Sequence, residues 1–305
     1  MCKIIVISYE IKNNILILRD FCIVVLYSLT ESKRINIICC DKKGSEFTMT
    51  RIIAFANQKG GVGKTTTAIN IGASLAAIKK RVLLIDLDQQ GNAGTGLGFV
   101  RAEHPQSVYG VIMGTDNIVD NILSTAVPGL HLLPSGIELA GAEVDLLDVE
   151  NREYRLRDAL QPILDYYDFI LLDCPPALGH LTLNALNAAD SVIIPLQCEF
   201  FALEGIRQLV NTINVVQQKW NPDLRILGVL LTMYDKRYSV TRDVENDVRK
   251  TFGDTVFKTV IPRNVRVSEA PSHGKPALFY DFNSTGAQAY LRVATEIVNK
   301  LEQEG

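Results

Sequence analysis

The stretch from Asn57 to Thr67 carries the residues best suited to chemistry. It reads Asn-Gln-Lys-Gly-Gly-Val-Gly-Lys-Thr-Thr-Thr, so three glycines lie between two lysines and are followed by threonines. Glycines allow successive backbone N–H groups to turn toward an anion, and a lysine placed as Lys64 is can reach the oxygens of a phosphate chain. The hydroxyl of Thr65, directly after that lysine, can hold Mg²⁺. The stretch therefore predicts a loop that binds a phosphorylated ligand.

The residues around this loop have the pattern that such a loop requires. An apolar run over residues 52–56 predicts a strand, and residues 68–77 have apolar positions at helical spacing. The loop departs from the usual G-x-x-x-x-G-K-[ST] pattern, because Gln58 stands at the first glycine position and a second lysine, Lys59, follows it. A chance glycine-rich turn is the alternative, and the strand–loop–helix order makes it the weaker explanation.

Two other apolar runs end in aspartates. Residues 82–88 end in Asp86-Leu87-Asp88, and residues 169–173 end in Asp173. Because the carboxyl ends of parallel strands meet at one edge of a sheet, we expect these carboxylates beside the phosphate loop, where Mg²⁺ and an attacking water would lie. Asp173 would orient the ligands of Mg²⁺, usually through water. The alternative for Asp86 and Asp88 is that they have no role in ligand binding and simply form a polar strand end that caps the next turn.

The order of apolar runs and helical stretches predicts an α/β fold with a doubly wound, mostly parallel sheet flanked by helices. Further strands are expected at residues 130–133, 169–173, 191–196, 226–233 and 256–261. Helices are expected at residues 108–113, 152–164, 203–219, 240–252 and 287–302. No linker, repeat or low-complexity tract interrupts residues 49–305, so we expect them to form one domain.

The loop resembles the deviant Walker A motif of the ParA/MinD ATPases, K-G-G-x-G-K-T-T. Residues 86–92 are similar to that family's D-x-D-P-Q-G-N pattern, with Gln89 in place of the proline, and residues 173–176 match its D-x-P-P pattern. Residues 195–205 and 261–276 resemble segments of the Soj-like chromosomal ParA proteins. The resemblance implies a P-loop NTPase fold and a slow, partner-stimulated ATPase that acts in chromosome or plasmid segregation.

The resemblance also implies roles for individual residues. Lys59 would reach across a dimer interface to the partner's nucleotide, Lys64 would bind the phosphates, and Asp88 would position the hydrolytic water, which makes these three the catalytic candidates. ATP or ADP would be held by the loop and by a segment that closes over the adenine, namely Gly60, Gly61, Val62, Gly63, Lys64, Thr65, Thr66, Pro262, Arg263 and Asn264. Mg²⁺ would be held, partly through water, by Thr65, Asp86 and Asp173.

Basic residues are frequent between residues 235 and 275, and their spacing alone fits an ordinary solvated surface equally well. In the ParA family, ATP-bound homodimers bind double-stranded DNA without sequence preference through basic residues of this half. Arg237 and Arg266 are therefore the first candidates for phosphate contacts, together with Lys275. The resemblance further implies a ParB-like partner and a cytoplasmic protein that associates with the nucleoid.

The composition of the chain limits which kinds of binding site it can hold. Its 305 residues carry a net charge of −3, so DNA binding would need a local basic patch. The six cysteines lack the spacing of a metal site or a disulfide framework, which indicates a reducing cytosol, and we expect Cys174 and Cys198 to be small buried side chains rather than iron–sulfur ligands. His273 could act as a base, but no nucleophile or carboxylate pattern surrounds it, so a loop histidine is expected.

Residues 1–48 differ from the rest of the chain. They hold four of the six cysteines and two apolar runs, each too short to span a bilayer and neither followed by a signal-peptide cleavage site. We expect an N-terminal extension that results from an over-extended reading of the gene, with the functional protein starting at Met49; a poorly packed appendage is the alternative. Mass spectrometry of the native N-terminus distinguishes the two.

Two other functions share the loop chemistry. A MinD-like ATPase of division-site placement would need a basic amphipathic C-terminal helix to bind a membrane, whereas residues 299–305 are largely acidic and lack bulky apolar anchors, so no membrane binding is expected. A nucleotide-gated scaffold would bind ATP and hardly hydrolyse it, and the presence of Asp88 argues against that.

Overall fold

The computed structural model describes residues 49–100, 104–199 and 202–303, together with the backbone of three short strands nearer the N-terminus. The chain divides into two compact units, residues 1–49 and 50–305. In the first unit, β1 (Leu16–Leu18), β2 (Phe21–Val25) and β3 (Ile37–Cys40) form an antiparallel sheet in that order. The predicted poor packing of residues 1–48 falls mainly on residues outside those described.

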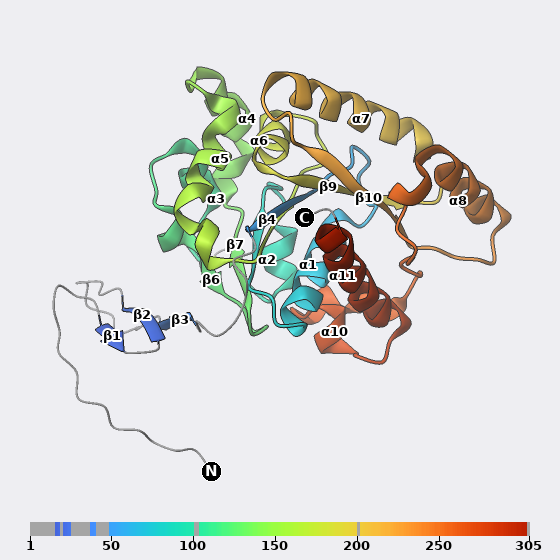
Figure 1. Ribbon diagram of the computed structural model, residues 1–305, viewed down its shortest axis with the longest axis horizontal. Coiled ribbons are helices and arrows are strands. Elements are labelled where there is room, and N and C mark those ends of the chain that lie inside the picture. The colour runs from blue at the N-terminus through green and yellow to red at the C-terminus, as the bar shows by residue number, and fades with distance from the viewer. Residues whose placement is uncertain are drawn as a thin grey trace, which may run out of the picture. The chain divides into compact units, whose positions relative to one another are not determined.

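A seven-stranded sheet forms the centre of the second unit (Figure 1). Its strands are β4 (Arg51–Phe55), β5 (Val82–Asp86), β6 (Leu123–Ser124), β7 (Leu130–Leu133), β8 (Phe169–Asp173), β9 (Ser191–Gln197) and β10 (Arg225–Thr232). They lie in the order β10-β9-β4-β8-β5-β7-β6, and every pairing is parallel except that of β6 with β7. The predicted doubly wound, mostly parallel sheet is confirmed.

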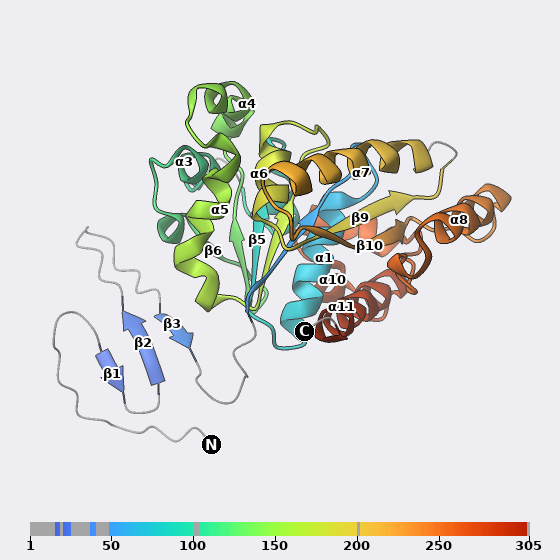
Figure 2. The same ribbon diagram turned by 45° about the horizontal axis from the view of Figure 1, so that its top comes forward.

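Helices cover both faces of this sheet (Figures 1 and 2). One face packs against α1 (Lys64–Ala77), α2 (Asn92–Gly96) and α11 (Thr285–Gln303). The other packs against α3 (Val108–Met113), α5 (Arg155–Leu160), α6 (His180–Ala188), α7 (Ala202–Lys219) and α8 (Ser239–Phe252). In β4, Ile53 and Phe55 belong to the first core and Ile52 and Ala54 to the second. Because both faces are buried, the central strands read as continuous apolar runs.

Short helical segments complete the unit. They are α4 (Ala142–Asp145), α9 (Val265–Glu269) and α10 (Ala277–Tyr280), with the 3₁₀ turns η2 (Ile118–Asn121), η3 (Ile137–Ala140), η4 (Leu146–Asp148), η5 (Arg152–Tyr154), η6 (Gln161–Tyr166), η7 (Gly253–Thr255) and η8 (Ala270–His273). The sequence predicted neither α6 nor the short helices α2, α4, α9 and α10. Segments of four or five residues are too short to show a helical period.

The predicted strand at residues 256–261 is wrong. In place of a strand there are two isolated bridges. Val256 pairs with Val229 in β10, and Pro262, which follows the predicted strand, pairs with Tyr234, which follows β10. The backbone N–H groups of Lys258 and Thr259 donate to the carboxylate of Glu296 in α11, at 2.7 and 3.2 Å. These N–H groups therefore bond to a helix side chain, and a regular strand does not form.

The predicted helix over residues 152–164 is broken into η5, α5 and η6. Pro162 lies in the first turn of η6, and it has no N–H with which to continue the α-helical hydrogen bonds of α5. Helix α1 begins at Lys64, four residues earlier than predicted, directly after a left-handed Gly63. The other predicted elements agree with the structure to within two residues at each end.

Candidate functional site

The glycine loop of residues 57–63 lies at the carboxyl end of β4, whose neighbours in the sheet are β8 and β9. Gly61 and Gly63 have φ values of +76° and +86°, a left-handed conformation that favours glycine. A Cβ atom added at Gly60 or Gly61 would meet nothing within 4 Å, so this side of the loop is open. Since α1 starts directly after Gly63, its N-terminus and the loop N–H groups can act on one anion.

Two hydrogen bonds tie the loop to β9 and β10, and a third holds it internally. The Asn57 side chain donates to the carbonyl oxygen of Pro195 in β9 at 2.7 Å and accepts from the Lys59 N–H at 3.0 Å. The Thr232 hydroxyl at the end of β10 donates to the carbonyl oxygen of Val62 at 2.8 Å. The sequence assigned no role to Asn57 or Thr232, because each bonds to a residue more than 130 positions away.

Lys64 is buried at the base of the loop, with 7% of its surface exposed. Its ammonium group donates to the carbonyl oxygen of Lys59 at 3.3 Å. Burial lowers the pKa of Lys64, and the negative charges of Asp173 and Asp88 oppose this shift. The structure thus brings Lys64 together with two of the predicted carboxylates, as a parallel sheet with this strand order requires.

Asp173 is fully buried, and neither of its carboxylate oxygens has a hydrogen-bond partner of ordinary geometry among the described residues. Burial raises the pKa of Asp173 well above its ordinary value, the charge of Asp86 adds to the rise, and the nearby Thr65 hydroxyl opposes it. A buried carboxylate whose nearest donor among the described residues is a threonine hydroxyl fits a bound cation. No group of three or more His, Cys, Asp and Glu side chains in the described part of the chain could hold a metal by itself, so Mg²⁺ would take its other ligands from phosphates and water.

Asp86 and Asp88 have different surroundings. Each oxygen of the buried Asp86 accepts a backbone N–H, from Asp88 at 3.1 Å and from Ala93 at 2.9 Å. Burial raises the pKa of Asp86, and these hydrogen bonds oppose the rise. Asp88 accepts from the Gln90 N–H at 3.0 Å and lies close enough to Lys64 to act on its charge. Asp86 therefore orders the turn after β5, and Asp88 is the carboxylate of this pair that faces the lysine's charge.

Lys59, the additional lysine of the loop, forms an ion pair with Glu199, which follows β9. The two side chains are 42% and 46% exposed. Sequence reasoning singled out the segment that contains Glu199 but gave this residue no role. The prediction that Lys59 acts on a second copy stays a prediction, and in this chain the lysine is paired with a carboxylate of its own chain.

The Pro262-Arg263-Asn264 segment lies at the same edge of the sheet as the loop. The Arg263 N–H donates to the carbonyl oxygen of Tyr234 at 3.0 Å, and Tyr234 follows the loop anchor Thr232 by two residues. The Asn264 side chain accepts from the Val267 N–H at 3.2 Å as the N-cap of α9 and donates to Thr285 of α11 at 2.9 Å. The Asn264 amide is thus used to shape this segment, which leaves the backbone, Pro262 and the exposed Arg263 side chain as the groups that could face a base.

Known proteins are similar over most of this chain. Residues 50–226 match the family model described as an AAA domain. Over 252 residues the chain is 55% identical to the chromosome partitioning protein ParA of Caulobacter vibrioides, which covers 82% of this chain and 94% of that protein. The chain belongs to the ParA/Soj family. This confirms the family predicted from the loop and the aspartate motifs.

Two further proteins are similar over most of the chain. The sporulation initiation inhibitor protein Soj of Bacillus subtilis is 55% identical over 249 residues, which span 82% of this chain and 98% of that protein. Among solved structures, cobyrinic acid a,c-diamide synthase from Mycobacterium smegmatis, with bound ATP analog and magnesium, is 42% identical with a TM-score of 0.75, covering 84% of this chain and 97% of that one.

The ParA/Soj resemblance pointed to three basic residues for DNA binding, and their surroundings differ. Arg237 pairs with Asp235 at 2.6 Å, and Arg266 pairs with Glu269 at 3.0 Å and with Asp281 at 3.4 Å. Lys275 is exposed, and within the described part of the chain it has no ion-pair partner. The arginines are therefore held in position by acids of their own chain, whereas the lysine is not.

Cys174 and Cys198 are free and buried in the core, as predicted. Burial raises the pKa of both thiols, that of Cys198 to about 11. Neutral thiols among apolar side chains act as small hydrophobic groups.

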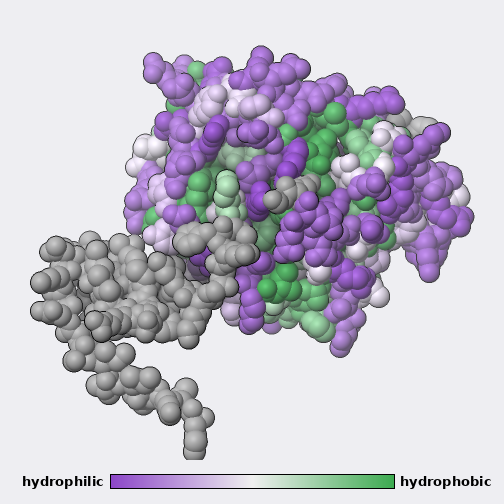
Figure 3. Space-filling view, in the orientation of Figure 1, coloured by the Kyte–Doolittle hydropathy of each residue, from purple (hydrophilic) through white to green (hydrophobic). Residues whose placement is uncertain are grey.

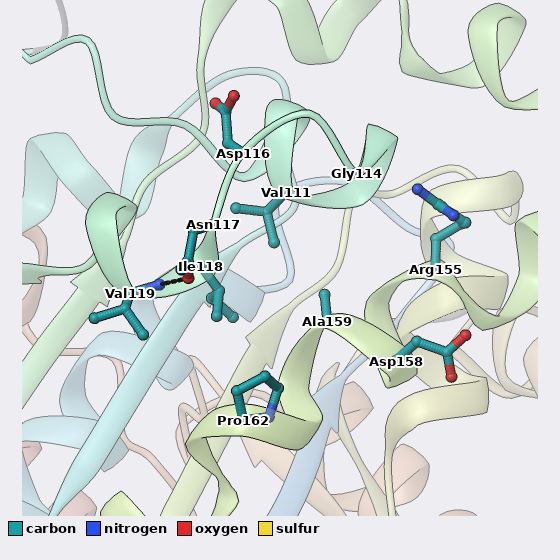
Figure 4. A pocket seen from close by; sticks show the side chains of 10 residues that line it. All are labelled: Val111, Gly114, Asp116, Asn117, Ile118, Val119, Arg155, Asp158, Ala159 and Pro162. Atoms are coloured by element: carbon teal, nitrogen blue, oxygen red, sulfur yellow. Dashed lines mark hydrogen bonds between the residues drawn. The ribbon is translucent and has the colours of Figure 1, made fainter.

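A separate cavity of about 360 Å³ lies between α3, η2, α5 and η6 (Figure 4). Arg155 lines it and donates to the carbonyl oxygens of Ile112 and Met113 at 2.9 and 2.8 Å, so its guanidinium is already hydrogen-bonded at the end of α3. None of the predicted site residues lines this cavity.

Proposed function

We propose that this ParA/Soj-family chain is a Mg²⁺-dependent ATPase whose ATP-bound form dimerises and binds DNA. The observation that carries the proposal is the meeting of Lys64, Thr65 and Asp173 at an open glycine loop. A buried ammonium and a buried carboxylate with the Thr65 hydroxyl beside it lie where loop N–H groups could receive phosphates. The ATP analog and magnesium bound to the M. smegmatis relative support this choice of ligand.

Each residue would have a defined part in hydrolysis. Lys64 and the backbone N–H groups from Gly60 to Thr66 would bind the phosphates, and Thr65 and Asp173 would hold Mg²⁺, the latter through water. Bound Mg²⁺ neutralises charge on the phosphate oxygens. Asp88 would orient the attacking water, and Asp86 would keep the turn that carries Asp88 in place. Phosphoryl transfer of this type depends on positioning and charge stabilisation, so a slow rate that a partner increases is chemically reasonable.

The test is ATP hydrolysis by the full chain with Mg²⁺, measured alone, with double-stranded DNA, with a ParB-like protein, and with both. We expect slow turnover alone and the largest increase with both. The Asp88→Ala variant should still bind ATP and lose hydrolysis. Unchanged hydrolysis by that variant would remove Asp88 from the mechanism. A nucleotide-gated scaffold would bind ATP and show no hydrolysis in a single-turnover experiment, with or without the partner.

DNA binding is proposed for Arg237, Arg266 and Lys275, and it would place the protein on the nucleoid in the cytoplasm. Non-specific binding to phosphates weakens with salt, with a log–log slope of about −0.9 for each phosphate neutralised. Each alanine variant should reduce the steepness of that slope by about 1 if the side chain contacts a phosphate. Arg207→Ala, on α7, serves as the control. Salt-independent DNA binding would contradict the proposal.

A MinD-like membrane function has less support. The apolar residues of α11, among them Val293, Ile297 and Leu301, are buried in the core against α1, so this face of the helix is already used within the domain. Within the described part of the chain, no helix combines the length and the apolar character needed to cross a bilayer. Pelleting with liposomes in the presence of ATP distinguishes the two functions.

We also propose that residues 49–305 form the ATPase domain and that residues 1–48 are an extension it does not require. Residues 50–305 form their own compact unit, and the family match begins at residue 50. A chain that starts at Met49 should retain full ATP hydrolysis. Loss of hydrolysis by that chain, if it is still folded, would contradict the proposal.

A further inference from the structure

The helical stretch of residues 137–148, formed by η3, α4 and η4, has apolar side chains on two sides. Leu139, Ala142 and Leu146 are buried in the core. Ile137, Val144 and Leu147 are exposed to 73%, 67% and 53%, and Ala140 is exposed as well. These four residues follow a spacing of three, four and three positions, which places them along one face of a helical stretch.

This exposed face is unusual for the surface of this chain. Three of the twelve large apolar side chains that are exposed in the described part of the chain lie within this stretch. Single exposed apolar residues need no explanation, whereas a contiguous apolar face with a polar rim marks an interaction site. In Figure 3 hydrophilic residues predominate at the top left, over α4, with small apolar areas between them.

The rim of the face is mainly acidic. One arginine reaches it: the Arg152 guanidinium donates to the carbonyl oxygen of Leu147 at 3.0 Å and pairs with Glu153 at 3.1 Å. Residues 102–151 contain eight of the 34 acidic residues of the chain and none of its 31 lysines and arginines. Around the apolar face itself lie Glu138, Glu143, Asp145, Asp148 and Glu150. Within the described residues no Lys or Arg forms an ion pair with them. Nucleic acids and anionic membranes would be repelled, and a helix with basic and apolar faces would be complementary.

One rim residue connects this face to the candidate active site. The Glu143 carboxylate accepts the backbone N–H groups of His180 at 2.7 Å and Leu181 at 3.2 Å, which are the first two residues of α6. A Cβ atom added at Gly179 would lie within 2.6 Å of the same carboxylate, so the contact is tight. Only six residues separate Asp173 from His180. A displacement of α4 would therefore act on the turn that follows Asp173.

We propose that the apolar face formed by Ile137, Ala140, Val144 and Leu147 binds a basic amphipathic helix of a partner protein, and that Glu143 transmits this binding to the turn between β8 and α6. Binding at the face is independent of the proposed ATPase function. Only an effect on ATP hydrolysis rests on that function.

The probe is a fluorescent peptide of about 15 residues made of leucine and lysine, with leucines at helical spacing, compared with a scrambled peptide of the same composition and charge. The full chain is titrated and anisotropy is measured. We expect the patterned peptide to bind at least about tenfold more tightly than the scrambled one. The Val144→Ser/Leu147→Ser variant should lose this preference. The matched control, Val215→Ser/Val240→Ser, changes exposed valines on α7 and α8 and should keep it.

Equal binding of the two peptides, or full binding by the Val144→Ser/Leu147→Ser variant, would overturn the docking face. Light scattering without peptide tests whether the face instead binds a second copy of this chain. If the wild-type chain forms oligomers that this variant does not form, the face binds a second copy instead and the proposal is wrong. Circular dichroism confirms that the variant is folded before either result is used.

Hydrogen exchange tests the connection through Glu143. We expect the patterned peptide to slow exchange of the N–H groups of residues 177–181 in the wild-type chain. In the Glu143→Gln variant this slowing should disappear while the affinity for the peptide changes by less than about threefold. Slowing that persists in Glu143→Gln would remove Glu143 as the connection. Because these readouts need no ATP, they are distinct from any failure of the proposed ATPase activity.

Discussion

The ammonium group of Lys59 forms an ion pair with the carboxylate of Glu199 in the same chain. Both side chains are nearly half exposed, and ion pairs of this kind contribute about 0.2–1 kcal/mol. If Lys59 acts on the nucleotide of a second copy, as proposed, the pair within the chain must break first. Glu199 would then oppose dimerisation by a small and measurable amount.

The Glu199→Gln variant should therefore dimerise more readily with ATP, by roughly 1.4- to fivefold per lysine, since Lys59 no longer has to leave a carboxylate of its own chain to reach the nucleotide of the second copy. Sedimentation with a non-hydrolysable ATP analogue measures this. Glu204→Gln, an exposed glutamate on α7, is the control and should behave as wild type. The Lys59→Ala variant should bind nucleotide as a monomer and fail to dimerise. Weaker dimerisation of Glu199→Gln, or normal dimers of Lys59→Ala, would contradict the role in trans.

Replacing Asp173 with asparagine should stabilise the fold and remove Mg²⁺-dependent nucleotide binding. Apart from the nearby Thr65 hydroxyl, the buried carboxylate has no hydrogen-bond donor among the described residues, so its ionised form is unfavourable, and a neutral amide of the same size avoids burying a charge. We expect a gain on the order of 1–3 kcal/mol, with about 2–4 °C in Tm for each kcal/mol. Calorimetry at pH 8 in the presence of EDTA checks this, with exposed Asp243→Asn as the control. A lower Tm than that of the wild-type chain would show that the carboxylate is satisfied without a cation.

The Thr232→Val variant should loosen the phosphate loop. The two side chains have nearly the same shape, but valine cannot donate to the buried carbonyl oxygen of Val62, which then lacks this hydrogen bond. We expect the free energy of unfolding to fall by about 1–3 kcal/mol and ATP to bind more weakly. Urea unfolding and a fluorescent ATP analogue measure the two effects. Thr212→Val on α7, whose hydroxyl bonds within its own helix, should change neither; wild-type ATP affinity in Thr232→Val would show that this bond does not support the loop.

His131 should link stability to pH. Its ring lies in β7 with Nδ1 at 2.8 Å from the Tyr167 hydroxyl, and burial lowers the pKa of His131 below its ordinary value of 6.5. Between these two pKa values the unfolded chain binds more protons than the folded chain. The contribution of His131 is therefore complete above about pH 6.5 and is lost as the pH falls through the folded pKa.

The free energy of unfolding, measured with urea, should accordingly decrease from pH 7.5 to pH 5.5. The decrease should be smaller in His131→Gln, because glutamine does not titrate in this range. His273→Gln changes an exposed histidine at the end of η8 and should leave the decrease as it is. An equal decrease in His131→Gln and in the wild-type chain would assign the pH dependence to other groups.

The sequence alone determined the parts of this protein that local chemistry specifies. The mostly apolar runs at residues 130–133 and 169–173 become β7 and β8 with the predicted bounds, because strands buried on both faces are composed largely of apolar side chains. The glycine loop was predictable because Gly61 and Gly63 take left-handed conformations that few other residues adopt. The gathering of Lys64, Asp88 and Asp173 followed from the rule that parallel strands end at one edge of the sheet.

Only the tertiary structure decided which distant groups meet. The pairing of Lys59 with Glu199, the support of the loop by Asn57 and Thr232, and the connection of Glu143 to α6 each join residues that are far apart in the chain. Residues 256–261 have the composition of a strand, and the carboxylate of Glu296 in α11 takes two of their N–H groups instead. Such contacts leave no period or motif in the sequence, because they depend on how helices and loops pack once the sheet has formed.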